Sequence, residues 1–423
     1  MTRLHILLSS EHLGVLEGRG NGVRIVYDRD LDPEGMVPLS LSMPLSRTRH
    51  RGRVVTHWLA ALLPDREPLL MRWRRDFGVR DLYPESLLAH VGEDVAGASQ
   101  FVREDRLENV LERHSELRML TAEDIAGLTL AAKRDSLPYD PVTSTGQFSL
   151  AGAQAKFALQ RVADDAWASP SGAEPSTHIF KPAIPGLEDQ DVGEVVSMRA
   201  AARLGLPTAH AFIAEFAGER VVGIERYDRW RDARGRWQRV HQEDLGQASG
   251  RDPRHKYESD GGLGIEGCGN LIREHCGQQD VETFARAIIY NYLIKGSDAH
   301  ARNYSLLLTP GDVRLAPLYD LNSTLLFGAA AEARQLAMRV GGEAELASIG
   351  IGNWRLFASS LRLDEDWLVR QLRDMAAELP GVIAELAGAP DIDGIADGAM
   401  RRLQQRSEQW CAKASQRLGR ATI

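Results

Sequence analysis

Apolar and polar positions in the first hundred residues follow two different periods. Runs with strand-like alternation come first and are separated by glycines: Leu4–Leu8, Gly14–Glu17 and Val23–Tyr27. Apolar positions then recur with a helical period, and prolines mark the boundaries: Val54–Leu63, Glu67–Phe77 and Asp81–Val91. We therefore predict a β-rich start that is followed by helices, the last of them at Thr121–Arg134.

The turn-rich stretch Asp135–Gln147 separates this region from a second one. The pattern then predicts a small antiparallel sheet with one packed helix: strands Phe157–Arg161, Thr177–Phe180, Ala211–Phe216 and Arg220–Tyr227, and a helix from Asp189 to Gly205. Beyond Gln242 helices dominate: Val281–Ile294, Leu363–Ala377 and Ala396–Leu418, with a hairpin at Tyr304–Leu308 and Val313–Ala316. A β-rich lobe followed by a helical lobe is an arrangement that can hold a nucleotide in the cleft between the lobes.

Composition excludes several classes of protein. Hydrophobic residues make up 43% and charged residues 26% of the 423, which argues against disorder over most of the length. The net charge of −8 disfavours a protein that coats nucleic acid. The three cysteines have no CxxC spacing, so we expect neither a disulfide framework nor a structural zinc site. Without a secretory signal or an apolar run near the ~20 residues of a membrane span, we expect a soluble, cytoplasmic protein.

Three common motifs are missing. The sequence contains no GxxxxGK[ST], no GxGxxG after a predicted strand and no HExxH. P-loop, dinucleotide-binding and zinc-hydrolase mechanisms therefore have no support.

The segment Gly296–Asn303 (GSDAHARN) follows the predicted helix Val281–Ile294 and carries the most chemistry. Asp298 and Asn303 stand five positions apart, which is the spacing of a protein-kinase catalytic loop. There a carboxylate receives the proton of the attacking hydroxyl and an amide oxygen binds Mg²⁺. Asp320 in APLYD offers a second acid where kinases hold a metal-binding aspartate. An Asx-turn in an exposed loop would give the same pair of residues, so the spacing alone leaves both interpretations open.

Three further segments fit a nucleotide site. Lys181 ends a predicted strand and Glu194 lies in the helix after it, as in the kinase lysine–glutamate pair, although a surface lysine would look the same. Glu225–Tyr227 end the last strand of the small sheet, where the kinase linker meets adenine and where an edge strand could also simply leave the sheet. Ser149–Lys156 (SLAGAQAK) places small residues and a lysine where backbone amides can approach phosphate, but it could equally be an interdomain loop. Their order along the chain, more than any one of them, indicates a kinase.

These segments resemble the HipA family of toxin kinases. The shared stretches occur in the family's order: SLAGAQAK, THIFKP, GEVVSMRAAARLGL, VGIERYDR, HQEDLGQASG, KYESDGG, GSDAHARN and APLYD. The front of the chain resembles the family's N-terminal subdomain in PLSLSMPL, LLPDREP and VGEDVAGA. The resemblance thus covers nearly the whole chain.

The resemblance implies an ATP- and Mg²⁺-dependent serine/threonine kinase, the toxin of a type II toxin–antitoxin system. It implies these roles: Asp298 as catalytic base with His300 and Asn303 beside it, Asn303 and Asp320 as metal ligands, Ala151, Gly152, Ala153, Gln154, Ala155, Lys156, Lys181, Glu225, Arg226, Tyr227 and Arg302 as the ATP site, Glu194 as a supporting ion-pair partner, and Ser149 as an autophosphorylation site that switches the kinase off. Two positions depart from the family: Arg302 stands where lysine is usual, and Ala155 where an acidic residue is common.

The fold expected from the resemblance is α+β, a two-lobed protein-kinase-like fold with an extra N-terminal subdomain. We predict four parts: the N-terminal subdomain (1–105), a helical linker (106–147), the small lobe with the ATP-binding loop (148–235) and the helical catalytic lobe (236–423). The implied partners are a HipB-like helix-turn-helix antitoxin, DNA only through that antitoxin, and a protein substrate such as an aminoacyl-tRNA synthetase.

Two other functions stay open. A non-catalytic HipA-like corepressor would bridge DNA-bound antitoxin, but the six filled catalytic positions argue against it. A small-molecule phosphotransferase has similar catalytic loops, but the LAGAQ loop and the N-terminal subdomain speak against it.

Overall fold

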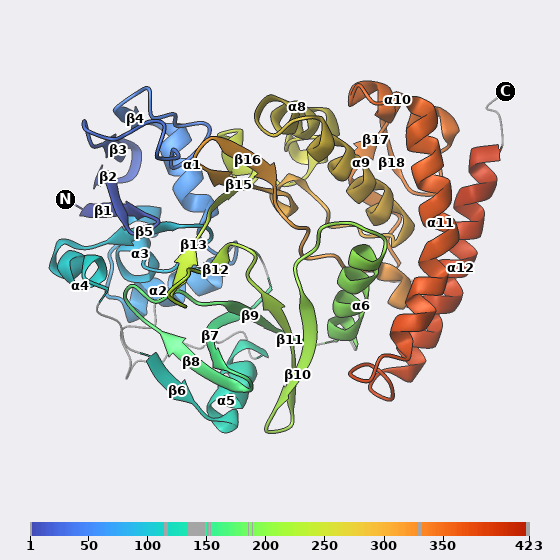
Figure 1. Ribbon diagram of the computed structural model, residues 1–423, viewed down its shortest axis with the longest axis horizontal. Coiled ribbons are helices and arrows are strands. Elements are labelled where there is room, and N and C mark those ends of the chain that lie inside the picture. The colour runs from blue at the N-terminus through green and yellow to red at the C-terminus, as the bar shows by residue number, and fades with distance from the viewer. Residues whose placement is uncertain are drawn as a thin grey trace. The chain divides into compact units, whose positions relative to one another are not determined.

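The computed structural model describes residues 2–113, 117–133, 149, 152, 154–184, 186, 187, 189–327 and 332–419 (Figure 1). The chain divides into two units. Unit 1 contains Met1–Pro182, Ala214–Arg254 and Leu306–Val313, and unit 2 contains Ala183–Ile213, His255–Ser305 and Arg314–Ile423. The turn-rich stretch 135–147 lies outside the described residues, and the four predicted domain boundaries stay predictions.

The N-terminal part of unit 1 is an antiparallel sheet in the order β4-β3-β2-β1-β5. Its strands are β1 (Thr2–Leu8), β2 (Glu11–Gly18), β3 (Arg24–Tyr27), β4 (Arg49–Arg51) and β5 (Ser99–Val102), and its helices are α1 (Arg53–Ala61), α2 (Glu67–Asp76), α3 (Pro84–Val91) and α4 (Leu107–Leu111). The predicted strands and helices of this region are confirmed. The pattern missed β4 and β5 because they are short, and β5 is buried along its whole length and so shows no alternation. The core buries Ile6, Trp58, Leu88 and Phe101 completely or nearly so.

A second sheet has the order β10-β11-β9-β7-β8-β6. Its strands are β6 (Leu117–Leu120), β7 (Phe157–Ala163), β8 (Ala166–Pro170), β9 (His178–Pro182), β10 (Ala211–Phe216) and β11 (Glu219–Glu225), and α5 (Ala122–Lys133) packs near β9 and β11. The four predicted strands are confirmed, and β6 and β8 extend the sheet beyond the prediction. The Phe157 and Phe180 rings stack at 5.4 Å, and Trp167 meets Phe180 edge-on at 4.9 Å.

Further short elements lie in unit 1, apart from Ser305, Arg314 and Leu315 at strand ends, which belong to unit 2. They are the hairpin β12 (Arg229–Arg231) and β13 (Trp237–Arg239), the sheet β14 (His241–Asp244), β15 (Ser305–Thr309) and β16 (Asp312–Leu315), and the helix α7 (Leu245–Ala248). The predicted hairpin of β15 and β16 is confirmed. A capping box begins α7: Asp244 accepts from the Gln247 amide, and Gln247 accepts from the Asp244 amide.

Unit 2 is mostly helical. Its elements are α6 (Gln190–Arg203), α8 (Ile265–His275), α9 (Gln278–Leu293), α10 (Ile351–Ser360), α11 (Glu365–Ala387), α12 (Asp397–Gly419) and the hairpin β17 (Gln335–Val340) and β18 (Glu343–Glu345). The predicted helices are confirmed, although α11 runs ten residues past its predicted end at Ala377 and continues through Pro380. The rings of Tyr292, Trp354 and Trp410 meet in the core, where Tyr292 lies 5.2 Å from Trp354 and 5.4 Å from Trp410. Within the described residues, no helix combines the length and the hydropathy that crossing a bilayer demands.

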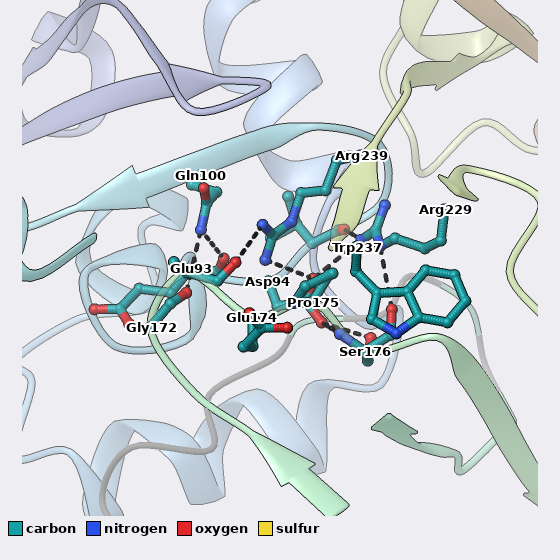
Figure 2. Close-up of polar contacts among 12 residues, drawn as sticks. Glu93, Asp94, Gln100, Gly172, Glu174, Pro175, Ser176, Arg229, Trp237 and Arg239 are labelled. Atoms are coloured by element: carbon teal, nitrogen blue, oxygen red, sulfur yellow. Dashed lines mark hydrogen bonds and ion pairs between the residues drawn. The ribbon is translucent and has the colours of Figure 1, made fainter. Parts of the chain in front are cut away.

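A buried charged cluster connects the end of β11 and the β12–β13 hairpin to the N-terminal part of unit 1. Figure 2 shows three of its residues, Asp94, Arg229 and Arg239. Asp94 accepts from Arg229 at 3.0 Å, and Arg226 and Arg239 lie within 3.7 and 3.6 Å of the same carboxylate. Asp228 accepts from Arg226 at 2.8 Å and from Arg229 at 3.0 Å. Burial raises the pKa of Asp94 and of Asp228, but the guanidinium charges outweigh burial and hold each pKa below its usual range. The cluster therefore consists of ionised, mutually paired groups.

Candidate active site

The segment that carries Asp298 begins at a tight turn after α9. Lys295 has a left-handed backbone with φ of 51°, and the Gly296 amide donates to the Asn291 carbonyl at 2.8 Å. A Cβ at Gly296 would lie 2.4 Å from Asn291 Oδ1, so only glycine fits without displacement. The Asp298 carbonyl then accepts from the His300 amide at 2.8 Å. The turn thus fixes where the predicted catalytic loop starts.

The structure brings Asn303 and Asp320 together. Asn303 Nδ2 donates to Asp320 Oδ2 at 3.3 Å, and Asn303 Oδ1 is buried and has no hydrogen-bond partner within the described residues. Asp320 has a left-handed backbone with φ of 58°, which costs about 1–3 kcal/mol in a residue other than glycine. A buried amide oxygen without a donor beside a carboxylate is what a hard divalent cation requires.

The Asp320 segment is held on both sides. Thr208 and Leu318 form a parallel β-bridge, in which the Leu318 amide donates to the Pro207 carbonyl at 2.8 Å. The Tyr319 hydroxyl donates to the Arg302 carbonyl at 2.9 Å and pairs with Ser305 Oγ at 2.7 Å. The loop and the Asp320 segment are therefore fixed relative to each other by contacts other than the Asn303–Asp320 pair.

The donors present fit Mg²⁺. Asn303 and Asp320 supply an amide and a carboxylate oxygen, and Mg²⁺ is typically held by one or two such protein groups together with phosphate and water oxygens. Among the described residues, no group of three or more His, Cys, Asp or Glu side chains could hold a metal by itself. A site built on these two residues would therefore need a nucleotide to complete the coordination.

His300 and Asp298 share one neighbour that the sequence analysis did not single out. The Tyr257 hydroxyl donates to Asp298 Oδ1 at 2.7 Å, and the Tyr257 ring meets the His300 ring edge-on at 5.5 Å. Burial lowers the pKa of His300 below its usual value, and its Nδ1 is buried with no hydrogen-bond partner in the described part of the chain. His300 is therefore neutral near pH 7.

Glu194 lies inside α6 and is fully buried. Gln190, one turn earlier, donates to Glu194 Oε2 at 3.3 Å and to Asn322 Oδ1 at 3.0 Å. Asn322 follows Asp320 by two residues, so the Gln190–Asn322 hydrogen bond joins α6 to the Asp320 segment within unit 2. Gln190 and Asn322 are further residues that the sequence analysis missed, since neither matches a motif.

Unit 1 carries the predicted phosphate-facing residues. Lys181 is buried on β9, opposite Val222 of β11. Gln154 Nε2 donates to the carbonyl of Pro182, the next residue, at 3.0 Å. A Cβ at Gly152, whose φ is 110°, would come within 2.8 Å of Lys156 Nζ, so the Lys156 ammonium lies directly against the Gly152 backbone. Ala155 is half-buried, whereas Ala151 and Ala153 lie outside the described residues.

The three predicted linker residues have different surroundings. Glu225 is exposed. The Arg226 side chain is buried in the charged cluster, and its amide donates to the Thr177 carbonyl at 2.9 Å. The Tyr227 hydroxyl donates to Gln242 Oε1. The Arg226 side chain therefore has a structural role in the cluster, a role that its motif did not reveal.

Ser149 is completely buried against the N-terminal part of unit 1. Its hydroxyl donates to the Leu62 carbonyl at 2.8 Å and its amide donates to the Asp94 carbonyl at 3.0 Å. Gly152 continues the contact: it forms a parallel β-bridge with Pro64 and accepts from the Asp65 amide at 3.2 Å. Ser149 and Gly152 of the predicted ATP-binding loop thus both contact residues 62–65.

Comparisons with known proteins find matches for both the N-terminal and the C-terminal parts of the chain. The model of the HipA-like C-terminal domain matches residues 148–383, and the model of the HipA N-terminal domain matches residues 4–102. A Sinorhizobium fredii protein named "Putative kinase Y4mE" is 32% identical over 361 residues, which cover 84% of each chain. The Shewanella oneidensis serine/threonine-protein kinase toxin HipA is 29% identical over 380 residues, 85% of this chain and 83% of that one.

A solved structure shows the same fold. Shewanella oneidensis HipA, in a complex with HipB and its operator DNA, superimposes with a TM-score of 0.84 at 24% identity over 98% of this chain and 97% of that chain. The fold is therefore the predicted α+β fold, sheet-rich in its N-terminal region and helical in its C-terminal region. Since both HipA domain models match in order and relatives named as kinases align along most of the length, the chain belongs to the HipA family of toxin kinases.

Proposed function

We propose that this protein is an ATP- and Mg²⁺-dependent serine/threonine protein kinase that acts as the toxin of a type II toxin–antitoxin system. The observation that carries the proposal is the Asn303–Asp320 pair, with its buried amide oxygen that lacks a donor. Leaving a buried acceptor unpaired costs about 1–3 kcal/mol, and a cation held by Asn303 and Asp320 would offset that cost.

Each residue of the predicted site would have a distinct role in phosphoryl transfer. Asn303 and Asp320 would hold Mg²⁺, which neutralises charge on the transferring phosphate. Asp298 is exposed, so its carboxylate can receive the proton of an incoming serine or threonine hydroxyl. Lys181 and Lys156 would bind the ATP phosphates, and Arg302 would replace the family's lysine near the γ-phosphate. Neutral His300 beside Asp298 adds no positive charge that would weaken the base.

The buried position of Ser149 supports its proposed role as an autophosphorylation site that switches the kinase off. Its hydroxyl is buried and already donates to the Leu62 carbonyl, so the segment has to leave residues 62–65 before Ser149 can be phosphorylated. A phosphoserine oxygen cannot donate to that carbonyl, and it brings a charge of about −1.5 to −2 into a fully buried position beside the Leu62 and Asp94 carbonyls. The modified segment would therefore stay displaced, and the ATP-binding loop with it.

The proposed partner and the proposed target both rest on membership of the family. The solved relative is bound to HipB and operator DNA, so we propose a HipB-like antitoxin for this chain, with DNA reached through it. The proposed target is a protein of translation such as an aminoacyl-tRNA synthetase.

Intact mass and peptide mapping after incubation with Mg-ATP, beside Asp298→Asn, test the proposal. We expect one phosphate on Ser149 in the wild type and none in the variant. A protein that binds ATP but transfers no phosphate, either to itself or to a mixture of translation proteins, would refute the kinase. A protein that binds no ATP would leave the corepressor function.

A further inference from the structure

Tyr257 begins a short loop whose backbone is fixed on two sides. Its carbonyl accepts from the Asp260 amide at 3.0 Å and from the Gly262 amide at 2.8 Å. A Cβ at Gly262 would lie 2.6–2.8 Å from the carbonyl oxygens of residues 255–257, so the loop closes only with glycine there. The Glu258 side chain then accepts from the Arg339 amide of β17 at 2.7 Å. The loop therefore presents the Tyr257 ring from a fixed position.

The Tyr257 side chain contacts two residues of the predicted catalytic loop. Its hydroxyl donates to Asp298 Oδ1 at 2.7 Å, across 41 residues of sequence, and its ring meets the His300 ring at 5.5 Å and 71°. Asp298 Oδ2 has no hydrogen bond within the residues that the structure describes. One oxygen of the carboxylate is thus engaged, and the other can receive a proton from outside.

We propose that Tyr257 is a positioning residue for Asp298, an inference that rests on the proposed kinase function. A hydrogen bond to Oδ1 stops rotation of the carboxylate and directs Oδ2 toward the hydroxyl of the protein substrate. Proton acceptance depends on such alignment, because displacement of a reacting group by about 1 Å can cost 100-fold in rate. Tyr257 is 37% exposed and Asp298 is exposed as well, so the Tyr257 ring lies beside the carboxylate and does not bury it.

Tyr257→Phe removes the hydroxyl and keeps the ring that packs on His300, so the loop should fold. We expect kcat for phosphoryl transfer to fall about ten-fold, while the KM for ATP and the affinity for Mg-ATP stay unchanged. A merely structural role would instead change ATP binding and kcat together. Tyr83→Phe, which alters another exposed tyrosine in unit 1, is the matched control and should change neither.

A double-mutant cycle with Asp298→Asn separates this inference from the kinase proposal. In the Asp298→Asn background, Tyr257→Phe should cause no further loss of rate, because it acts through the carboxylate. An active wild type whose kcat is unchanged or raised by Tyr257→Phe would overturn the positioning role and leave the kinase proposal standing. Transfer that survives Asp298→Asn at the full rate would overturn Asp298 as the base and, with it, the positioning role of Tyr257. A wild type without transfer would overturn the kinase proposal itself.

Discussion

Replacing Asp94 by asparagine tests whether the buried charged cluster holds unit 1 together. Asp94 is 7% exposed and its carboxylate faces three cations, Arg226, Arg229 and Arg239, at 3.7, 3.0 and 3.6 Å. It also accepts from the Ser176 hydroxyl at 2.5 Å and from the Ser176 amide at 3.1 Å. Asparagine has the same shape, so the substitution removes one charge and creates no cavity.

The expected loss of stability is large because the charges that remain after the substitution are buried. After the substitution, Arg226 and Arg229 still pair with Asp228, whereas Arg239 loses its ion pair with Asp94. Removing one partner from a buried ion pair costs about 3–5 kcal/mol, which is two to three and a half powers of ten in the unfolding equilibrium. The amide nitrogen of the substituted side chain would also point a donor at other donors. The pKa of Asp94 is lowered, so the stabilisation is present above its ordinary pKa and is lost as the pH falls through the folded value.

Urea denaturation at pH 7 measures the loss of global stability. Hydrogen exchange of peptides from the β12–β13 hairpin measures the local loss. Asp105→Asn is the control: Asp105 also accepts from an arginine, Arg103 at 2.9 Å, but both side chains are exposed, so the loss of stability should be much smaller. If Asp94→Asn costs no more than Asp105→Asn, the cluster does not stabilise the unit through its charges and the reasoning is refuted.

Three further results are expected. Burial raises the pKa of Glu243 to about 7, so the folded state binds the proton more tightly and stability should fall by about 3 kcal/mol as the pH rises from about 4.5 through 7; urea midpoints should show this slope in the wild type and not in Glu243→Gln. Gly296→Ala should lower the rate of phosphoryl transfer more than ten-fold, because its Cβ would press on Asn291 Oδ1. Gly350→Ala is the control and should leave the rate unchanged, because its Cβ meets no atom within 4 Å. Equal rates for the two variants would contradict this prediction. Asp320→Gly should abolish Mg²⁺-dependent transfer yet change the free energy of unfolding by less than about 1 kcal/mol, because relief of the left-handed backbone offsets the flexibility of glycine; a large loss of stability would contradict it.

Local sequence patterns predicted the helices, the strands and the Asp298–Asn303 loop. They could not predict contacts between residues that lie far apart in the sequence. The helical period of Val281–Ile294 and the spacing of Asp298 and Asn303 are properties of a few consecutive residues, and both could be read directly from the sequence. The hydroxyl on Asp298 comes from Tyr257, 41 residues earlier, and the cation on Asp94 comes from Arg229, 135 residues later. Neither contact leaves a trace in local periodicity. Only the fold shows that the Arg226 side chain serves the cluster.

Backbone strain adds an argument for function that no motif supplies. Three residues other than glycine have left-handed backbones beside the predicted site in unit 2: Asp189 with φ of 60°, Lys295 with φ of 51° and Asp320 with φ of 58°. They stand at the start of α6, at the turn into the predicted catalytic loop and at the proposed metal-binding position. Strain of this kind persists only where surrounding contacts enforce it, and it gathers at functional sites. Glycine would relieve this strain, so the presence of aspartate at position 320 supports the proposed metal-binding role of its carboxylate.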